Sequence, residues 1–487
     1  MATRQLNELR ISAAHYQELR AHLLRPDRDE HGALLLVGAD TTGGRVLLTV
    51  REVHPLTHDE FPPGKHGYRQ FAAPALARLG NRAAAERLAL VTLHSHPGAR
   101  DRNALSRDDL RAHERVFPHL LDITTAPVVA GVALGESSVA GEIWWRDGHR
   151  RPLDRIRVVG PTLEFVYPEP PHDAAALDDR FDRQVRLFGA VGQERLGALH
   201  VAVVGAGGGG SILIEQLAHL GVGTITAIDF DVVKQHNLSR IMGATEADSR
   251  RDTKKVEVAR RLVRAIDPGI DFRAVDGDIA DERTARLLTD ADYLLLATDT
   301  ATARLVANAV SQTFLIPLIQ IGAKVETRKD GGIEQIYTAV RPVLPRRGCL
   351  ACAGLIDPIA LQREVATPEE RANQNYLGDP AVIDPSVTTL NATAAAGALN
   401  VLLMSVIGQA SEELAAHRIT LTREGHVLAL EDRRDPACRW CGEDSLSRYA
   451  RADLSLLPVR ASILEGEHAT RSGGRWRRML RRLLAGT

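Results

Sequence analysis

The chain has few cysteines, and its charges nearly cancel. Its four cysteines form two Cys-x-x-Cys pairs, which in a reducing cytoplasm suit a metal better than disulfides. Lys and Arg number 61 against 62 Asp and Glu, a formal charge of -1, so the whole chain has no electrostatic attraction for nucleic acid. Its first twenty residues contain no apolar stretch followed by a small-residue cleavage site, which argues against a secretory signal. We therefore expect a cytoplasmic protein whose partner is not nucleic acid.

Long apolar runs are also lacking. The most apolar long segment, 392–408, is rich in Ala and Gly and is interrupted by Asn400. It is shorter than the roughly 20 residues that a membrane-spanning helix needs, so we interpret it as a buried helix and expect no membrane span. The remaining composition is that of a globular protein. At 487 residues the chain exceeds what one hydrophobic core usually supports, which predicts two domains.

The sequence pattern divides the chain into two domains, a linker and an extension. Residues 1–160 mix β-rich runs at 33–38 and 45–50 with amphipathic helices near 12–24 and 72–89, which indicates a compact α+β unit. Residues 161–179 carry four prolines, as is typical of a linker. From 180 to 442 strands alternate with helices, which predicts a doubly wound parallel sheet. Residues 443–487 end in a basic amphipathic tail with Arg471, Arg475, Arg477, Arg478, Arg481 and Arg482. We interpret it as a solvated surface helix, with contact to a membrane, RNA or an acidic partner as the alternative.

A stretch after an apolar strand in the first half carries metal-binding side chains. His94 and His96 lie two residues apart at the end of that strand and project to the same side. Asp109, near the start of a probable helix, can supply an oxygen from a second direction. Three protein ligands leave one position for water, as in a catalytic zinc site that lowers the pKa of water toward roughly 7. Glu30 directly precedes HGALLLVG, at the end of an apolar strand, and is the best upstream carboxylate to accept a proton.

Together with Pro97 and Ser106, these residues resemble the JAMM (MPN/JAB) signature of zinc isopeptidases over roughly residues 10–150. The resemblance implies a JAMM/cytidine-deaminase-like α+β fold. It also implies zinc bound by His94, His96 and Asp109, Glu30 as general acid/base, and Ser106 as the residue that hydrogen-bonds the oxyanion of the tetrahedral intermediate. Nine residues separate His96 from Ser106, about two more than we expect, so the loop 98–105 is enlarged and its charged residues are candidates for substrate contact.

A glycine-rich turn opens the second half of the chain. VAVVGAGGGG places Gly205, Gly207 and Gly210 ahead of a helix that we expect from Ser211, and Asp229 ends the next strand. Glycines let the backbone approach phosphates at a helix N-terminus, and the later acid can bind a ribose hydroxyl. The turn alone does not show whether the site binds a dinucleotide or another nucleotide. Attack of a carboxylate on the α-phosphate of ATP needs cations around the triphosphate and carboxylates for magnesium. The residues around the turn favour this reaction: Arg183, Asp231, Asn237, Arg240, Lys255, Asp299 and Arg304.

These residues look like the ThiF/MoeB/HesA family, relatives of the ubiquitin-activating enzymes, over roughly residues 178–442. The resemblance implies a Rossmann-like fold with Asp229 on the ribose, Asn237, Arg240 and Lys255 on the ATP phosphates, and Asp299 serving magnesium and the reacting carboxylate. Asp231 and Arg304 complete the expected nucleotide site. Lys254 is the competing choice for the lysine, but VEVA after Lys255 matches the family helix. Arg183 is expected to reach the active site of the other subunit of a homodimer.

The four cysteines predict a second, structural zinc. Cys349-x-x-Cys352 and Cys438-x-x-Cys441 have the spacing of a closed four-thiolate site, and their placement also resembles the structural zinc of the ThiF/MoeB/HesA family. Every cysteine is then committed to metal, so none remains to take an acyl group from AMP. We expect the enzyme to stop at the acyl-adenylate or to deliver it to a nucleophile on another protein.

The two halves together predict a bifunctional enzyme. One half activates the C-terminal carboxylate of a ubiquitin-like or sulfur-carrier protein with ATP and Mg²⁺, and the other processes or removes that protein with Zn²⁺. A conjugating enzyme or a sulfur donor is a further expected partner, and the sequence leaves conjugation and sulfur transfer both open. The alternatives are a non-catalytic docking scaffold and a nucleotide-dependent oxidoreductase, the latter disfavoured by the Arg/Lys/Asp set.

Overall fold

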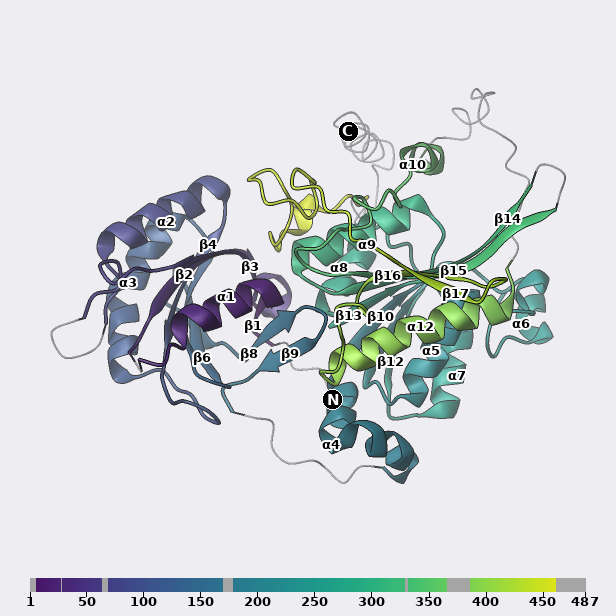
Figure 1. Cartoon of the computed structure of the whole chain (residues 1–487), viewed down its shortest axis with the longest axis horizontal. Coiled ribbons are helices and arrows are strands. Elements are labelled where there is room, and N and C mark those ends of the chain that lie inside the picture. Colours follow the sequence, from purple (N-terminus) through teal and green to yellow (C-terminus); the bar gives the residue numbers. More distant parts are fainter. Residues whose placement is uncertain are drawn as a thin grey trace. The chain divides into compact units, whose positions relative to one another are not determined.

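The computed structural model describes residues 6–27, 29–63, 69–169, 178–328, 332–365 and 386–460. The chain divides into two compact units, shown in Figure 1. The first unit comprises Met1–Asp173, Thr313–Leu315 and Gly442–Ser455, and the second comprises Ala174–Gln312, Ile316–Cys441 and Leu456–Thr487. The predicted basic tail lies outside the described residues.

The first unit is built on a nine-stranded mixed sheet with the order β7-β6-β5-β4-β2-β3-β1-β8-β9. Its strands are β1 (Glu8–Ser12), β2 (Gly32–Asp40), β3 (Leu47–Pro55), β4 (Ala89–Ser95), β5 (Val128–Leu134), β6 (Val139–Trp145), β7 (Arg150–Pro152), β8 (Arg155–Val159) and β9 (Leu163–Val166). Its helices are α1 (Ala13–Leu23), α2 (Ala73–Glu86) and α3 (Arg107–Thr124), with a 3-10 turn η1 (Thr42–Gly44). The predicted strands at 33–38 and 45–50 and the predicted helices near 12–24 and 72–89 are confirmed by β2, β3, α1 and α2.

Helices cover both faces of this sheet because its central strand is apolar on both sides. Leu35 of β2 belongs to the core cluster that includes Tyr16 and Leu19 of α1. Its neighbour Leu34 belongs to the opposite cluster, with residues of α2 and α3. Successive side chains of a strand point to opposite faces, so an uninterrupted apolar run such as β2 requires a layer on each side (Figure 1). His94 lies near the end of β4, after the buried apolar residues of that strand.

The boundaries of the first unit differ from the expected ones in two places. β9 lies inside the predicted linker 161–179, where it pairs with β8 and buries Leu163 and Val166. The prolines of that segment flank β9 without interrupting it, so the ladder can form. The segment Gly442–Ser455, predicted to start a separate extension, belongs to the first unit.

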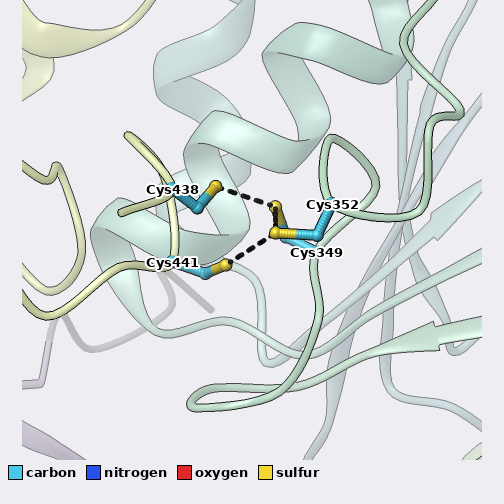
Figure 2. A group of neighbouring side chains, drawn as sticks. All are labelled: Cys349, Cys352, Cys438 and Cys441. Carbon is cyan, nitrogen blue, oxygen red and sulfur yellow. Dashed lines mark hydrogen bonds between the residues drawn. The ribbon is translucent and has the colours of Figure 1, made fainter. Parts of the chain in front are cut away.

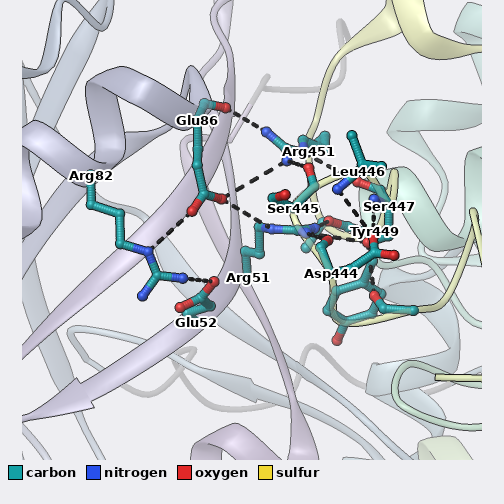
Figure 3. A network of polar contacts seen from close by, with 12 residues as sticks. Arg51, Glu52, Arg82, Glu86, Asp444, Ser445, Leu446, Ser447, Tyr449 and Arg451 are labelled. Atoms are coloured by element: carbon teal, nitrogen blue, oxygen red, sulfur yellow. Dashed lines mark hydrogen bonds and ion pairs between the residues drawn. The ribbon is translucent and has the colours of Figure 1, made fainter. Parts of the chain in front are cut away.

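A buried arginine anchors this returning segment, as Figure 3 shows. Arg51 of β3 donates to the Tyr449 carbonyl at 2.5 Å, to the Ser447 hydroxyl at 3.2 Å and to the Asp444 carbonyl. Thr49, also on β3, donates to the Ala450 carbonyl at 2.9 Å. The segment lacks regular strand structure, so side chains of β3 supply hydrogen bonds that a neighbouring strand would otherwise make.

The second unit is built on an eight-stranded sheet with the order β12-β11-β10-β13-β14-β15-β16-β17. Its strands are β10 (His200–Val204), β11 (Thr224–Ile228), β12 (Asp271–Val275), β13 (Tyr293–Leu296), β14 (Leu318–Thr327), β15 (Ile333–Val343), β16 (His417–Leu421) and β17 (His426–Leu430). Its helices are α4 (Asp182–Ala198), α5 (Gly208–His219), α6 (Glu246–Arg250), α7 (Lys255–Ile266), α8 (Glu282–Leu287), α9 (Ala301–Phe314), α10 (Pro358–Val365) and α12 (Thr388–Val406). Short 3-10 turns are η2 (Asp179–Phe181), η3 (Gln235–Asn237) and η4 (Leu288–Asp290), and η5 (Leu454–Leu456) lies where the chain passes from the first unit to the second.

The strand order places a topological switch point between β10 and β13. The strands from β12 to β14 are parallel, with α5 and α7 on one face and α8 and α9 on the other (Figure 1), and β15 to β17 continue the sheet in antiparallel pairs. The predicted doubly wound sheet is therefore confirmed, with an antiparallel extension. Ligands of such sheets bind outside the carboxyl ends of the strands at the switch point.

One helix among the described residues, α12, is long and apolar enough to cross a membrane by length and composition alone. It packs against α5 and on β14 and β15, and its buried residues include Ala394, Ala398 and Leu402. This confirms the buried helix predicted at 392–408.

Candidate functional site

Three predicted metal ligands of the first unit converge at the end of β4. The Nε2 atoms of His94 and His96 lie 3.0 Å apart. His94 Nε2 lies 3.2 Å from one carboxylate oxygen of Asp109, and His96 Nε2 lies 3.5 Å from the other. Nitrogen ligands at a tetrahedral zinc, with bonds of 2.0–2.1 Å, lie roughly 3.3 Å apart. The donor types and their spacing therefore fit a zinc ion held by these three residues.

Ser106 and Asp109 hold each other in place at the start of α3. The Asp109 amide donates to the Ser106 hydroxyl at 3.1 Å, and the Ser106 amide donates to the Asp109 carboxylate at 2.7 Å. This capping box satisfies two amides of the first helical turn. Burial opposes ionisation of Asp109, but hydrogen bonds from His94 and His96 hold its pKa well below its usual range. The Ser-x-x-Asp spacing thus serves the helix end and presents a carboxylate to the histidines.

Glu30 stands two residues before β2, the strand that pairs with β4. Gly32 of β2 pairs with His94 of β4, and the His31 amide donates to the Ser95 hydroxyl at 2.9 Å. Glu30 therefore lies on the segment that enters the sheet beside His94 and Ser95. Burial lowers the pKa of His96, but hydrogen bonds with Asp109 and Asn103 and the charges of Asp109 and Glu30 raise it above its usual value.

The enlarged loop between His96 and Ser106 is held by neighbouring segments. Arg100 pairs with Glu136 at 2.7 Å and Arg102 with Glu169 at 2.6 Å, all four side chains being well exposed. Two of the loop's three charges, expected as candidates for substrate contact, thus have partners within the unit. Asn103, which motif spacing did not single out, contacts His96 Nδ1 at 2.9 Å through its Oδ1.

The glycine turn of the second unit lies at the switch point. Gly205 follows β10 with φ of 95°, and a Cβ there would lie 2.8 Å from the Ala297 carbonyl after β13. A Cβ at Gly210 would lie 1.8 Å from the Gly205 carbonyl. Gly207 is the N-cap of α5, which begins three residues before the expected Ser211. The tight turn therefore needs glycine at positions 205 and 210, and it places the N-terminus of α5 just beyond the carboxyl end of β10.

Asp229 and Lys255 meet beside this turn. The Asp229 carboxylate accepts hydrogen bonds from the amides of Ala206 at 2.7 Å and Asp231 at 2.8 Å. Burial raises the pKa of Asp229, although the Lys255 charge and the hydrogen bonds oppose the rise. Lys255 Nζ lies 2.6 Å from Asp231 and 3.9 Å from Asp229. Lys254 instead contacts the Phe230 carbonyl and Asp276, so the geometry favours Lys255 over Lys254.

Arg240 and Asn237 follow β11 on the same side. Asn237 is buried and accepts a hydrogen bond from the Lys234 amide at 3.0 Å. The Arg240 side chain borders Gly208, where a Cβ would lie 3.2 Å from Arg240 Cδ and 2.5 Å from Asn391 Nδ2. No motif in the sequence singles out Asn391, because only the fold brings α12 to the start of α5.

The other residues expected at the nucleotide site lie outside this group of side chains. Asp299 is exposed in the loop after β13, on the other side of the switch point from Asp229. Arg304 of α9 donates to the Leu355 carbonyl at 3.4 Å. Arg183 of α4 is 87% exposed and lies 3.9 Å from Asp182, so it points into solvent in the single chain.

The four cysteines form one cluster, shown in Figure 2. Cys349 lies 3.9 Å from Cys352 and 3.7 Å from Cys438, and Cys352 lies 3.4 Å from Cys441, measured between sulfur atoms. Four thiolates around zinc at 2.3 Å lie roughly 3.8 Å apart. The Trp440 amide also points at Cys438 Sγ at 3.5 Å. The cluster therefore fits the predicted closed zinc site.

Comparison with known proteins matches residues 181–439 to the model of the ThiF family. The match covers more than half of the chain, and the chain belongs to the ThiF family. This agrees with the resemblance drawn from the glycine turn and the residues around it.

The curated relatives are named as adenylyltransferases or as an activating enzyme. The chain is 31% identical over 191 residues to the molybdopterin-synthase adenylyltransferase of Haemophilus influenzae, covering 37% of this chain and 76% of that protein. It is 30% identical over 182 residues to the SAMP-activating enzyme E1 of Haloferax volcanii, covering 37% and 63%. It is 31% identical over 200 residues to the sulfur carrier protein ThiS adenylyltransferase of Bacillus subtilis, covering 38% and 57%. The match thus spans between about half and three quarters of each relative's length.

Proposed function

We propose that the second unit adenylates the C-terminal carboxylate of a ubiquitin-like or sulfur-carrier protein. The observation that carries this proposal is the meeting of the Gly205 turn, Asp229 and Lys255 at the switch point of a ThiF-family domain. A carboxylate oxygen attacks the α-phosphorus of ATP, and the bond to the departing pyrophosphate breaks. Amides at the start of α5 and the side chains of Asn237, Arg240 and Lys255 hold phosphate oxygens, Asp229 holds the ribose, and Asp299 is the residue to hold magnesium.

In this proposal the enzyme stops at the acyl-adenylate or delivers the acyl group directly to a nucleophile on another protein. All four cysteines of the chain lie in the one cluster described above, so no other thiol is present to form a thioester. A conjugate on any of these cysteines that a reducing agent releases, trapped while the cluster still holds zinc, would contradict this proposal.

We further propose that the first unit is a JAMM-type zinc hydrolase acting on the same class of protein. The convergence of His94, His96 and Asp109 supports it, and a zinc ion there would supply a Lewis acid that lowers the pKa of water. Glu30 takes the proton of the attacking water and returns it to the departing amine. The Ser106 hydroxyl, which accepts from Asp109, still has a hydrogen to donate to the oxyanion.

We also propose that the second unit forms a homodimer in which Arg183 serves the partner's site. α4 exposes Leu187 by 66% and Val191 by 60% along with Arg183. Large apolar side chains exposed on one helix are typical of a surface that another protein covers. A closed two-fold dimer would bring each copy of α4 to its partner.

Mass spectrometry of the full chain with ATP, magnesium and candidate carrier proteins tests both activities. We expect an acyl-adenylate that Asp299→Ala abolishes, and loss of residues beyond the carrier's glycine terminus that Glu30→Ala abolishes. Absence of both products with every candidate, although two zinc ions are bound, would favour the docking scaffold. The oxidoreductase alternative requires nicotinamide binding without ATP consumption, and membership of the ThiF family argues against it.

A further inference from the structure

The side chain of Asn103 is fixed at both ends. Its Nδ2 donates to the Ala133 carbonyl of β5 at 3.0 Å. A backbone carbonyl only accepts, so Nδ2 must be the end that faces Ala133, and Oδ1 must face His96. The Asn103 amide also donates to the Pro168 carbonyl at 3.1 Å, which holds the backbone of the loop at this residue.

This orientation determines which nitrogen of His96 carries hydrogen. Asn103 Oδ1 lies 2.9 Å from His96 Nδ1 and can only accept. Nδ1 must therefore carry the hydrogen, and in the neutral ring Nε2 keeps its lone pair. Nε2 is the atom that faces His94 and Asp109.

From this geometry we infer that Asn103 is a positioning residue for the metal centre: it selects the His96 tautomer and ring orientation that present Nε2 to zinc. The inference rests on the proposed zinc site of the first unit. Partners of this kind fix the tautomer of a metal-binding histidine, and their loss typically costs 10–100-fold in metal affinity. Asn103 belongs to the enlarged loop 98–105, so this loop supplies a residue to the metal centre.

Zinc binding to the full chain tests the inference without any activity assay. Stoichiometry and competition with a chromophoric chelator are measured for the wild type and four variants. We expect two zinc ions in the wild type and one in His94→Ala. Asn103→Leu should still bind two, with the affinity for the second about 10–100-fold weaker. Asn103→Asp keeps an acceptor for His96 but loses the donor to Ala133, and it should recover most of the affinity.

Arg102→Ala is the matched control. It removes the Arg102–Glu169 ion pair of the same loop and leaves Asn103 in place, so we expect unchanged zinc affinity. Long-range ¹H–¹⁵N NMR of the zinc-loaded protein should show the wild-type His96 with its hydrogen on Nδ1 and Nε2 bound to zinc, and this single pattern should be lost in Asn103→Leu.

The outcomes separate this inference from the proposed function. If His94→Ala loses one zinc but Asn103→Leu binds both with unchanged affinity, the role of Asn103 is refuted and the metal centre stands. Equal losses in Asn103→Leu and Asn103→Asp would mean that the bond to Ala133 matters, not the contact with His96, which also overturns the inference. If His94→Ala still binds two zinc ions, the proposed metal centre itself is wrong.

Discussion

At the residue scale, two adjacent lysines offer a clean test of the nucleotide site. Lys255 meets Asp229 and Asp231, whereas Lys254 contacts Asp276 and a backbone carbonyl. Removing one charge that stabilises a transferring phosphoryl group costs roughly 100-fold or more in rate. We expect Lys255→Met to lower carrier-dependent ATP–pyrophosphate exchange by about that factor, and Lys254→Met to change it only a few-fold. The reverse order would assign the phosphate role to Lys254.

Sequence motifs located most of the candidate site but not its supporting contacts. His94, His96 and Asp109 were predictable because strand period and a helix start bring them together from a short stretch of chain. The glycine turn was predictable for the same reason. Asn103 and Asn391 were not, because an asparagine in a loop or at a helix start has many uses. Only the approach of β5 to one loop, and of α12 to α5, gives these two residues their contacts.

At the scale of elements, a substitution of Arg51 tests which contacts hold the segment Gly442–Ser455 in place. Burial lowers the pKa of Arg51, and its hydrogen bonds go to backbone carbonyls and a hydroxyl of the segment (Figure 3). Arg51→Leu removes the hydrogen bonds to those buried acceptors, at about 1–3 kcal/mol for each. We expect a lower free energy of unfolding and faster hydrogen exchange in 442–455, both measured on the full chain.

Arg82→Ala is the control for that experiment. Arg82 belongs to the same polar network and pairs with Glu52 and Glu86, but its side chain is 44% exposed. Exposed ion pairs contribute about 0–1 kcal/mol. Similar exchange rates in 442–455 for Arg51→Leu and the wild type would show that the segment is held by other contacts.

Three neighbouring strands of the second sheet share a polar ladder that contains a histidine. Arg341 of β15 donates to Gln320 of β14 at 2.6 Å and to His417 of β16 at 2.9 Å. Burial and the Arg341 charge lower the pKa of His417 to about 4, whereas an unfolded histidine titrates near 6.5. The unfolded chain therefore takes up a proton first as the pH falls, and native stability decreases between about pH 6.5 and 4.

Urea unfolding at pH 7, 5.5 and 4.5, followed by a signal from the second unit, measures this decrease in the free energy of unfolding. We expect His417 to account for about 1–2 kcal/mol, a figure reduced for solvent screening of its half-exposed ring. His417→Gln should flatten the pH profile by that amount, and His426→Gln, on the exposed strand β17, should not. Identical profiles for His417→Gln and the wild type would contradict the ladder's role.

Element boundaries were less predictable than elements. β9 was hidden because four prolines within nineteen residues are typical of a linker, yet they flank the four-residue strand. The return of Gly442–Ser455 to the first unit carries no local pattern at all. It depends on arginine and threonine side chains of β3, whose partners lie about 400 residues away in sequence.

At the scale of the whole molecule, the proposed dimer makes a prediction that a monomer cannot meet. If Arg183 acts on the partner's site, a heterodimer of Arg183→Ala and Asp299→Ala chains has one site with both residues intact and one site with neither. Equal mixing with subunit exchange makes half of the dimers heterodimers, so about one quarter of the wild-type sites should be restored. Each variant alone should be nearly inactive in carrier-dependent ATP–pyrophosphate exchange. Complementation that appears on mixing and depends on exchange time places Arg183 across the interface, whereas activity equal to the mean of the two variants would place it within its own subunit.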